Sequence, residues 1–138
     1  MDTTTILLVE DELLHRRMYE TALKKLPQVR VLTAAEEGAA LKLIRQERPA
    51  IILLDLVVPR AAPKPGDISF HEPVGLSILR AIKKDPQTKA ARVIIFSNLD
   101  ADEHKQKAKA LGAEAYLIKA NVPPHALTDF ISGFLKQT

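Results

Sequence analysis

The sequence has no cysteine and no tryptophan, and aromatic residues make up only 4% of the chain. Without cysteine there is no disulfide, no thiolate metal site and no cysteine nucleophile, which suits a reducing compartment, and we expect a cytoplasmic protein. The apolar runs are all far shorter than the roughly 20 residues that a membrane-spanning helix needs. The first of them also lacks the preceding basic region of a secretion signal. Neither membrane insertion nor secretion is therefore expected.

The net charge is small, and glycine is scarce. The 20 lysine and arginine residues exceed the 17 aspartate and glutamate residues by three, and the densest basic cluster, HKQKAKA at 104–110, is interpreted as a solvated helix face. Because no aromatic residues interleave with the basic ones to stack on bases, direct nucleic-acid binding is not expected. The five glycines form no glycine-rich loop after the first apolar run, which disfavours flavin or nucleotide binding.

The sequence does contain an alternation of short apolar runs and helical periods. Continuous apolar runs predict central parallel strands at 6–9, 51–54, 93–96 and 115–118, and a more alternating run predicts an edge strand at 29–33. The apolar residues at helical spacing between and after these runs are Leu14, Met18, Ala22 and Leu26; Ala40, Leu43 and Ile44; Leu76, Leu79 and Ile82; Ala108 and Leu111; and Leu127, Phe130, Ile131 and Phe134. Such strand–helix repetition forms parallel βαβ units with helices on both faces of one sheet. We therefore expect an α/β fold with a doubly wound, five-stranded parallel sheet and five helices.

The length of 138 residues suits one domain, and no linker or repeat divides it, so we predict a single domain over residues 1–138. The unusual segment is PRAAPKPGDISFHEP at 59–73, which has four prolines and one glycine. Connections in such folds usually have about two to six residues. This extended loop is therefore expected to be functional or mobile.

Reactive side chains come at the ends of four predicted strands. Glu10 and Asp11 follow the first strand, and Asp55, Ser97 and Lys119 follow the third, fourth and fifth. In open parallel sheets, ligands bind beyond the carboxyl ends of the strands, where these side chains would converge. Each residue has an ordinary alternative role: Asp11 and Ser97 as helix caps, Asp55 as the start of a turn. Lys119 could be a surface lysine. Together, however, three carboxylates would repel one another unless a cation lay among them, so the group predicts a metal site.

The types of donor favour magnesium at this site. The donors are hard oxygen ligands, and no cysteine or histidine lies at these strand ends, which disfavours zinc. Mg²⁺ accepts one or two carboxylates and keeps several waters, so it leaves room for phosphate oxygens. A lysine and a hydroxyl directed at the same place suit a phosphoryl group that a carboxylate attacks. Asp55, which is central in the sheet, is the candidate nucleophile.

Four segments, ILLVEDE, IILLDLVVP, VIIFSN and AYLIKA, resemble the motifs of the response regulator receiver domain of two-component signalling, in order and, except for the long loop, in spacing. The resemblance covers essentially the whole chain. It implies a stand-alone receiver with a flavodoxin-like fold and strand order 2-1-3-4-5. It also implies that Asp55 accepts a phosphoryl group from a histidine kinase or a histidine phosphotransfer protein. Mg²⁺ would be bound by Asp11, Asp55 and the backbone carbonyl of Val57.

The same resemblance implies roles for the other residues of the site. Glu10 would act on the metal through water, Ser97 would hold a phosphoryl oxygen, and Lys119 would pair with the phosphoryl group. Tyr116 would be the rotating aromatic residue that senses Ser97. Phosphorylation adds nearly two negative charges at Asp55, which would draw in Ser97 and Lys119 and let Tyr116 turn inward. The alternative for Tyr116 is an ordinary half-buried aromatic residue on an edge strand.

Three features depart from the family pattern. The family has a glycine soon after the proline that follows the phosphoacceptor, whereas fifteen residues separate Pro59 from Gly75 here. The insertion could form a partner-docking surface, partly cover the phosphorylation site or be a passive excursion, and His71 within it is interpreted as solvated. Asn98 replaces the usual alanine and could narrow access to the phosphoryl group. Ala120 replaces a proline that usually makes a cis bond; without proline such a bond costs about 2.5–4 kcal/mol, so the geometry of the bond before Ala120 stays open.

Three functions compete at this point. The preferred one is a phosphoacceptor switch that acts on a downstream protein target and catalyses only its own phosphorylation and dephosphorylation, with homodimerisation through the fourth helix, fifth strand and fifth helix as one option. The second is a small phosphohydrolase with an aspartate nucleophile, although Val57 stands where such enzymes commonly carry a second aspartate. The third is a receiver-like scaffold that is not phosphorylated, against which the retention of every reacting group argues.

Overall fold

The computed structural model describes residues 2–60 and 72–136, and in this part of the chain the strands form one five-stranded parallel sheet with the order β2-β1-β3-β4-β5. The strands are β1 (Thr4–Val9), β2 (Val29–Ala34), β3 (Ile51–Leu54), β4 (Arg92–Ser97) and β5 (Ala115–Ile118). The predicted fold class and strand order are confirmed. The apolar run at 115–118 taken alone indicated a central strand and in this was wrong, because β5 lies at the edge of the sheet and its four residues are only partly buried. The predicted strand order had already placed this strand at the edge.

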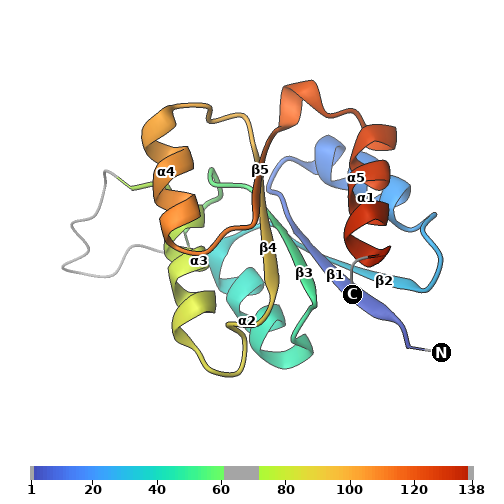
Figure 1. Cartoon of the computed structure of the whole chain (residues 1–138), viewed down its shortest axis with the longest axis horizontal. Coiled ribbons are helices and arrows are strands. Elements are labelled where there is room, and N and C mark those ends of the chain that lie inside the picture. Colours follow the sequence, from blue (N-terminus) through green and yellow to red (C-terminus); the bar gives the residue numbers. More distant parts are fainter. Residues whose placement is uncertain (1, 61–71, 137–138) are drawn as a thin grey trace.

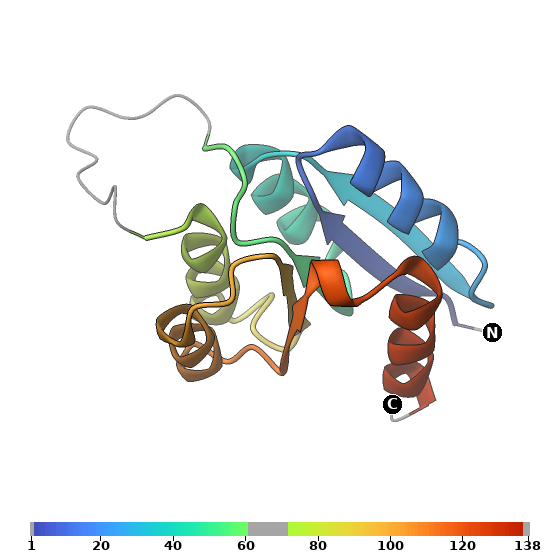
Figure 2. The ribbon, with the colours of Figure 1, turned by 90° about the horizontal axis from the view of Figure 1, so that it is seen from above.

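Two layers of helices cover the two faces of this sheet (Figures 1 and 2). The helices are α1 (Leu13–Leu23), α2 (Glu37–Glu47), α3 (Val74–Lys84), α4 (Asp102–Ala110) and α5 (Pro124–Lys136), and a single 3-10 turn (Lys119–Asn121) lies between β5 and α5. On one side α1 and α5 pack together, and on the other α2, α3 and α4 form the second layer. No helix in the described ranges is both long and apolar enough to cross a membrane.

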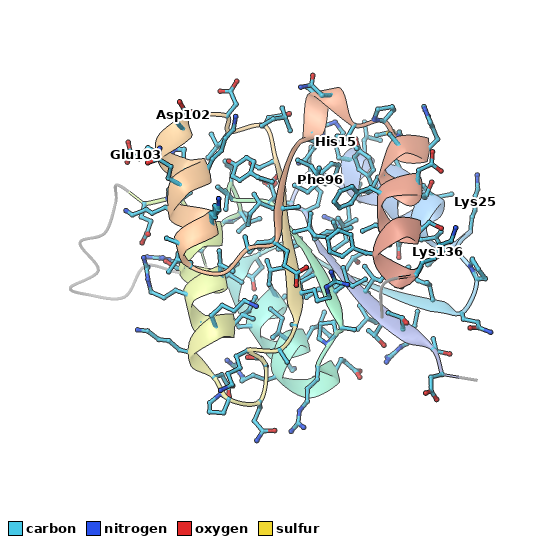
Figure 3. The ribbon with its side chains drawn as sticks, viewed as in Figure 1. His15, Lys25, Phe96, Asp102, Glu103 and Lys136 are labelled. Carbon is cyan, nitrogen blue, oxygen red and sulfur yellow. The ribbon has the colours of Figure 1, made fainter. Side chains whose placement is uncertain are left out.

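The core is split by the sheet into two apolar clusters. Along β1, Ile6 and Leu8 face α1 and α5, whereas Leu7 and Val9 face the opposite layer, as expected for side chains that alternate across a strand. Figure 3 shows Phe96 of β4 in the interior and the labelled side chains Lys25 and Lys136 at the periphery. Strands β1, β3 and β4 read as continuous apolar runs because both faces of the sheet are covered.

Helix α1 buries only part of the predicted stripe: Ala22 is buried and Leu26, just beyond the helix, packs against the core. Leu14 and Met18, two members of the predicted apolar stripe, are 72% and 42% exposed, whereas Tyr19 and Leu23 are buried. The Tyr19 ring packs in the core and its hydroxyl donates a hydrogen bond to the carbonyl of Val122 at 3.1 Å. A tyrosine can be buried in this way because its ring is apolar and its polar tip finds a partner.

Helix α3 begins directly against the end of β3. The Gly75 N–H donates to the Leu56 carbonyl at 2.9 Å. A Cβ atom at this glycine would lie 2.4 Å from Leu56 Cα and 2.5 Å from the Asp55 carbonyl oxygen, so only glycine fits without a shift. The chain therefore returns, after the long connection, to the place where β3 ends.

Ion pairs fix both described ends of the long connection. Arg60 lies 3.3 Å from Glu37 of α2, and the Glu72 carboxylate accepts two hydrogen bonds from Arg80 of α3, at 2.8 and 2.9 Å. Residues 61–71 lie outside the described residues, so the predictions for the insertion and for His71 stay predictions. The basic cluster at 104–110 is a solvated helix face as predicted, since α4 buries only Ala108.

Candidate functional site

The carboxyl ends of four strands bring the predicted side chains to one edge of the sheet. Val9 pairs with Leu54 and Ser97 with Ile118 in the strand register, so the residues that follow come level with one another. The open pocket at this edge is lined by Glu10, Asp11, Glu12, His15, Asp55, Val57, Ser97, Asn98, Leu99 and Lys119. Every site residue predicted from the strand ends is in this set; Tyr116, predicted from the resemblance, lies beside it.

Lys119 is the centre of the charged group. Its Nζ donates to Asp55 Oδ2 at 2.6 Å and also to Glu10 Oε1, and all three side chains are buried. Burial opposes the charge on Lys119, but the hydrogen bonds to Asp55 and Glu10 outweigh it and raise the pKa of the ammonium above its usual value. The alternative that Lys119 is an ordinary surface lysine is wrong.

The remaining oxygens of the two buried acids accept backbone hydrogen bonds. Asp55 Oδ1 accepts from the Val57 N–H at 3.0 Å, and Glu10 Oε2 accepts from the Glu12 N–H at 2.9 Å. Asp55 thus also begins a turn, which was the ordinary alternative for this residue. The turn holds the carboxylate in place, and the alternative role and the site role are compatible.

Asp11 is not the cap of the following helix. Glu12 caps α1, because its side chain accepts hydrogen bonds from the N–H groups of Leu14 and His15. The Asp11 side chain is exposed, and carboxylate oxygens of Glu10, Asp11 and Asp55 lie within 4.8 Å of one another. Asp11 is therefore available as a ligand at the rim of the pocket.

The charge balance favours a divalent cation, for a reason that corrects the argument from the sequence. That argument took the cation among the carboxylates to be a metal, but Lys119 already provides one positive charge there. Three carboxylates against one ammonium still leave two negative charges. An all-oxygen set with an exposed member suits a hard cation that keeps some of its waters.

Ser97 and Tyr116 are connected through the loop between β4 and α4. Ser97 is fully buried and its Oγ accepts from the Leu99 N–H at 3.4 Å, while the Leu99 carbonyl accepts from the Tyr116 hydroxyl at 2.5 Å. Burial, followed by the charge of Asp55, raises the pKa of the Tyr116 hydroxyl. Ser97 is not a helix cap, because α4 begins only at Asp102. Tyr116 is partly buried on the edge strand, as its alternative role expected, and in addition its hydroxyl has a partner in the Leu99 carbonyl.

Two further contacts at the site were missed from the sequence. The Asn98 Oδ1 accepts a hydrogen bond from the Ala120 N–H at 2.7 Å, and Arg16 donates to the carbonyls of Glu10 and Asp11 at 3.1 and 3.2 Å. The first contact could have been anticipated in part, because alanine at 120 has a backbone N–H that proline lacks and that needs an acceptor. The second could not, because carbonyl acceptors are not encoded by residue type. No peptide bond in the described ranges is cis, so the bond before Ala120 is trans.

Comparison with known proteins assigns the family. Residues 6–131 match the response regulator receiver domain. The chain belongs to this family. This receiver domain is 33% identical over 115 residues to Protein PilH of Pseudomonas aeruginosa, covering 83% of this chain and 84% of PilH. It is 29% identical to Protein PilG of the same organism, covering 95% of this chain and 96% of PilG.

The solved structures agree with this assignment. The receiver domain superposes on a LuxR-family two-component response regulator from Aurantimonas sp. SI85-9A1 with a TM-score of 0.76 and 28% identity, covering 99% of this chain and 87% of that one. The predicted family is thereby confirmed, and the protein is a regulatory receiver domain of two-component signalling.

Proposed function

We propose that this protein is a phosphoacceptor switch, a single receiver domain over residues 1–138 in which Asp55 accepts a phosphoryl group. The observation that carries the proposal is the contact between Lys119 Nζ and Asp55 Oδ2, at 2.6 Å, beside the acidic cluster of Glu10 and Asp11. A buried carboxylate held by an ammonium at the edge of an acidic pocket can take up a phosphoryl group whose oxygens the same cations neutralise.

In the reaction, an Asp55 carboxylate oxygen attacks the phosphorus of a phosphohistidine. The P–N bond breaks, its electron pair returns to the ring nitrogen, and that nitrogen takes up a proton. Lys119 pairs with the transferred group and Ser97 donates its hydroxyl hydrogen to a phosphoryl oxygen. Mg²⁺, when bound, neutralises phosphoryl oxygens.

The residues that would hold Mg²⁺ are Asp11, Asp55 and the Val57 carbonyl, with Glu10 acting through water. The oxygen-only donor set and the two uncompensated negative charges support this ion.

The output of the switch passes through Tyr116. A phosphoryl group that draws in Ser97 also pulls on the Leu99 N–H that Ser97 holds, and the Leu99 carbonyl is the partner of the Tyr116 hydroxyl. A shift of this loop therefore changes the packing of α4 and β5.

Receiver domains of this family interact with histidine kinases and with downstream proteins. For this protein, a histidine kinase or histidine phosphotransfer protein would be the phosphoryl donor and a protein would be the target. The face of α4, β5 and α5 would bind that target or a second copy of the chain.

Incubation with acetyl phosphate and Mg²⁺, followed by intact-mass measurement, tests the proposal. One phosphoryl group should be added, and Asp55→Asn or a chelator should abolish the addition. Asp102→Asn is the matched control, since Asp102 is an exposed acid that points outward from the start of α4 (Figure 3). A mass increase that persists in Asp55→Asn would contradict the proposal. Continuous turnover of phosphoesters would favour the phosphohydrolase, and an unchanged mass would favour the scaffold.

A further inference from the structure

One hydrogen bond joins the loop that follows Ser97 to the turn that carries Lys119. The Ala120 N–H donates to Asn98 Oδ1 at 2.7 Å, across 22 residues of sequence. Asn98 follows Ser97 and Ala120 follows Lys119, so the bond connects the immediate neighbours of two residues that converge on Asp55. Because an N–H needs an acceptor, the contact also defines which end of the Asn98 amide faces Ala120.

The turn that presents Lys119 has little else to define it locally. Lys119–Asn121 is a single 3-10 turn whose backbone bond is the one from the Val122 N–H to the Lys119 carbonyl, at 3.1 Å. Such turns have poorer hydrogen-bond geometry than an α-helix. A proline at 120 would restrict the backbone by its ring, but alanine imposes no such restriction. The constraint has to come from outside the turn: the Tyr19 hydroxyl binds the Val122 carbonyl at its far end, and Asn98 binds the Ala120 N–H within it.

The Lys119 side chain depends on this turn. Its Nζ lies between Glu10 and Asp55, both of which are held by backbone N–H groups, whereas the lysine reaches them from a turn at the edge of the sheet. A rotation of the turn shifts the base of the Lys119 side chain relative to two carboxylates that their own N–H partners hold. The loss of even one charge-assisted hydrogen bond of this kind changes an equilibrium strongly.

We propose that Asn98 is a positioning residue for Lys119: its side-chain carbonyl holds the Ala120 N–H and thereby the turn that places the ammonium beside Asp55. This role depends on the hydrogen-bond acceptor of Asn98. It differs from a role for the bulk of the side chain in narrowing access to the phosphoryl group. Its effect on phosphorylation rests on the function proposed above, whereas its effect on Lys119 does not.

The test measures Lys119 directly in the unphosphorylated protein. Hydrogen exchange of the Lys119 ammonium is followed by ¹⁵N NMR, with the signal assigned by its absence in Lys119→Arg. Asn98→Ala removes the acceptor, and Asn98→Leu removes it while keeping a side chain of similar shape. Asn121→Ala is the matched control, because Asn121 is an exposed asparagine of the same turn.

We expect both Asn98 variants to speed exchange of the Lys119 ammonium about fivefold, the effect of losing one ordinary hydrogen bond, and Asn121→Ala to leave it unchanged. The rate of phosphorylation by saturating acetyl phosphate should fall by a similar factor in both variants. If the Lys119 ammonium exchanges at the wild-type rate in Asn98→Leu alone, the size of the Asn98 side chain and not its acceptor matters, and the proposal is overturned. The wild-type rate in both variants would mean that Asn98 has no role in placing Lys119. A wild-type protein that takes up no phosphoryl group would refute the proposed function, but the exchange measurement would still decide the role of Asn98.

Discussion

Replacing Gly75 by alanine should destabilise the protein and disturb the phosphorylation site together. The added Cβ would lie 2.4 Å from Leu56 Cα and 2.5 Å from the Asp55 carbonyl oxygen. Ordinary van der Waals contacts begin at 3.4 Å. Either the start of α3 or the segment Asp55–Leu56 therefore has to move by about 1.0 Å, the difference between 3.4 and 2.4 Å. Both atoms belong to the backbone at the end of β3, so no flexible side chain can absorb the shift.

The magnitude follows from two opposing effects. Overpacking of this kind costs about 1–3 kcal/mol, whereas alanine in place of glycine in a helix gains up to about 1 kcal/mol. Since Gly75 is only the second residue of α3, the gain is small. We expect the free energy of unfolding to fall by about 1–2 kcal/mol, which corresponds to a Tm lower by about 3–8 °C.

Gly133→Ala is the matched control, with an effect of opposite sign. Gly133 lies inside α5, and a Cβ there would meet nothing within 4 Å. Both substitutions restrict the unfolded chain equally, so this contribution cancels between them. Gly133→Ala should raise the free energy of unfolding by about 0.5–1 kcal/mol.

Urea unfolding and thermal melts followed by circular dichroism measure both variants, and the phosphorylation rate at Asp55 should fall in Gly75→Ala alone. If Gly75→Ala is as stable as the wild type, the close approach of α3 to the end of β3 is not what requires glycine. A loss of stability in Gly133→Ala equal to that in Gly75→Ala would point instead to a general intolerance of alanine at glycine positions.

Three further predictions concern single contacts. Lys119→Met should bind Mg²⁺ about tenfold more tightly in a calorimetric titration. The substitution removes an ammonium that lies 2.6 Å from Asp55 Oδ2 and repels the ion. Weaker binding would mean that the ammonium and the metal do not share this carboxylate. A hydrogen bond from Arg92 lowers the pKa of Glu114, so this pair stabilises the fold at neutral pH, and its contribution is lost as the pH falls below about 4 through the lowered pKa of the folded state. Glu114→Gln should therefore lower the free energy of unfolding by less than about 1 kcal/mol at neutral pH and by nothing measurable at about pH 3; an equal loss at both pH values would refute the ion pair as the cause. Thr88→Val should lower the free energy of unfolding in urea by about 1 kcal/mol, because the buried Thr88 hydroxyl donates to the Ile82 carbonyl of α3 at 2.8 Å. An unchanged stability would show that this carbonyl needs no donor.

Most of the fold could be predicted from the sequence, because burial on both faces leaves a direct mark on a strand. The runs at 51–54 and 93–96 are continuous and apolar for that reason, and both became central strands. The prediction was weaker for 115–118, since an apolar run of four residues looks the same on a partly covered edge. It was only partly right for the face of α1, where Ala22 is buried as predicted but Tyr19 is buried in place of Met18. The two residues are neighbours on the helix, and helical spacing alone does not distinguish them.

The sequence by itself determined which residues stand at the strand ends, because chain order and the parallel arrangement place Glu10, Asp55 and Lys119 at one edge. Only the tertiary structure decided how they meet. Lys119 contacts residues 64 and 109 positions away, so the cation expected among the acids is in part the protein's own. The bond from the Ala120 N–H to Asn98 Oδ1 likewise depends on the distance between two segments that are 22 residues apart. Such distances result from packing between segments far apart in sequence, which no local pattern of residue types contains.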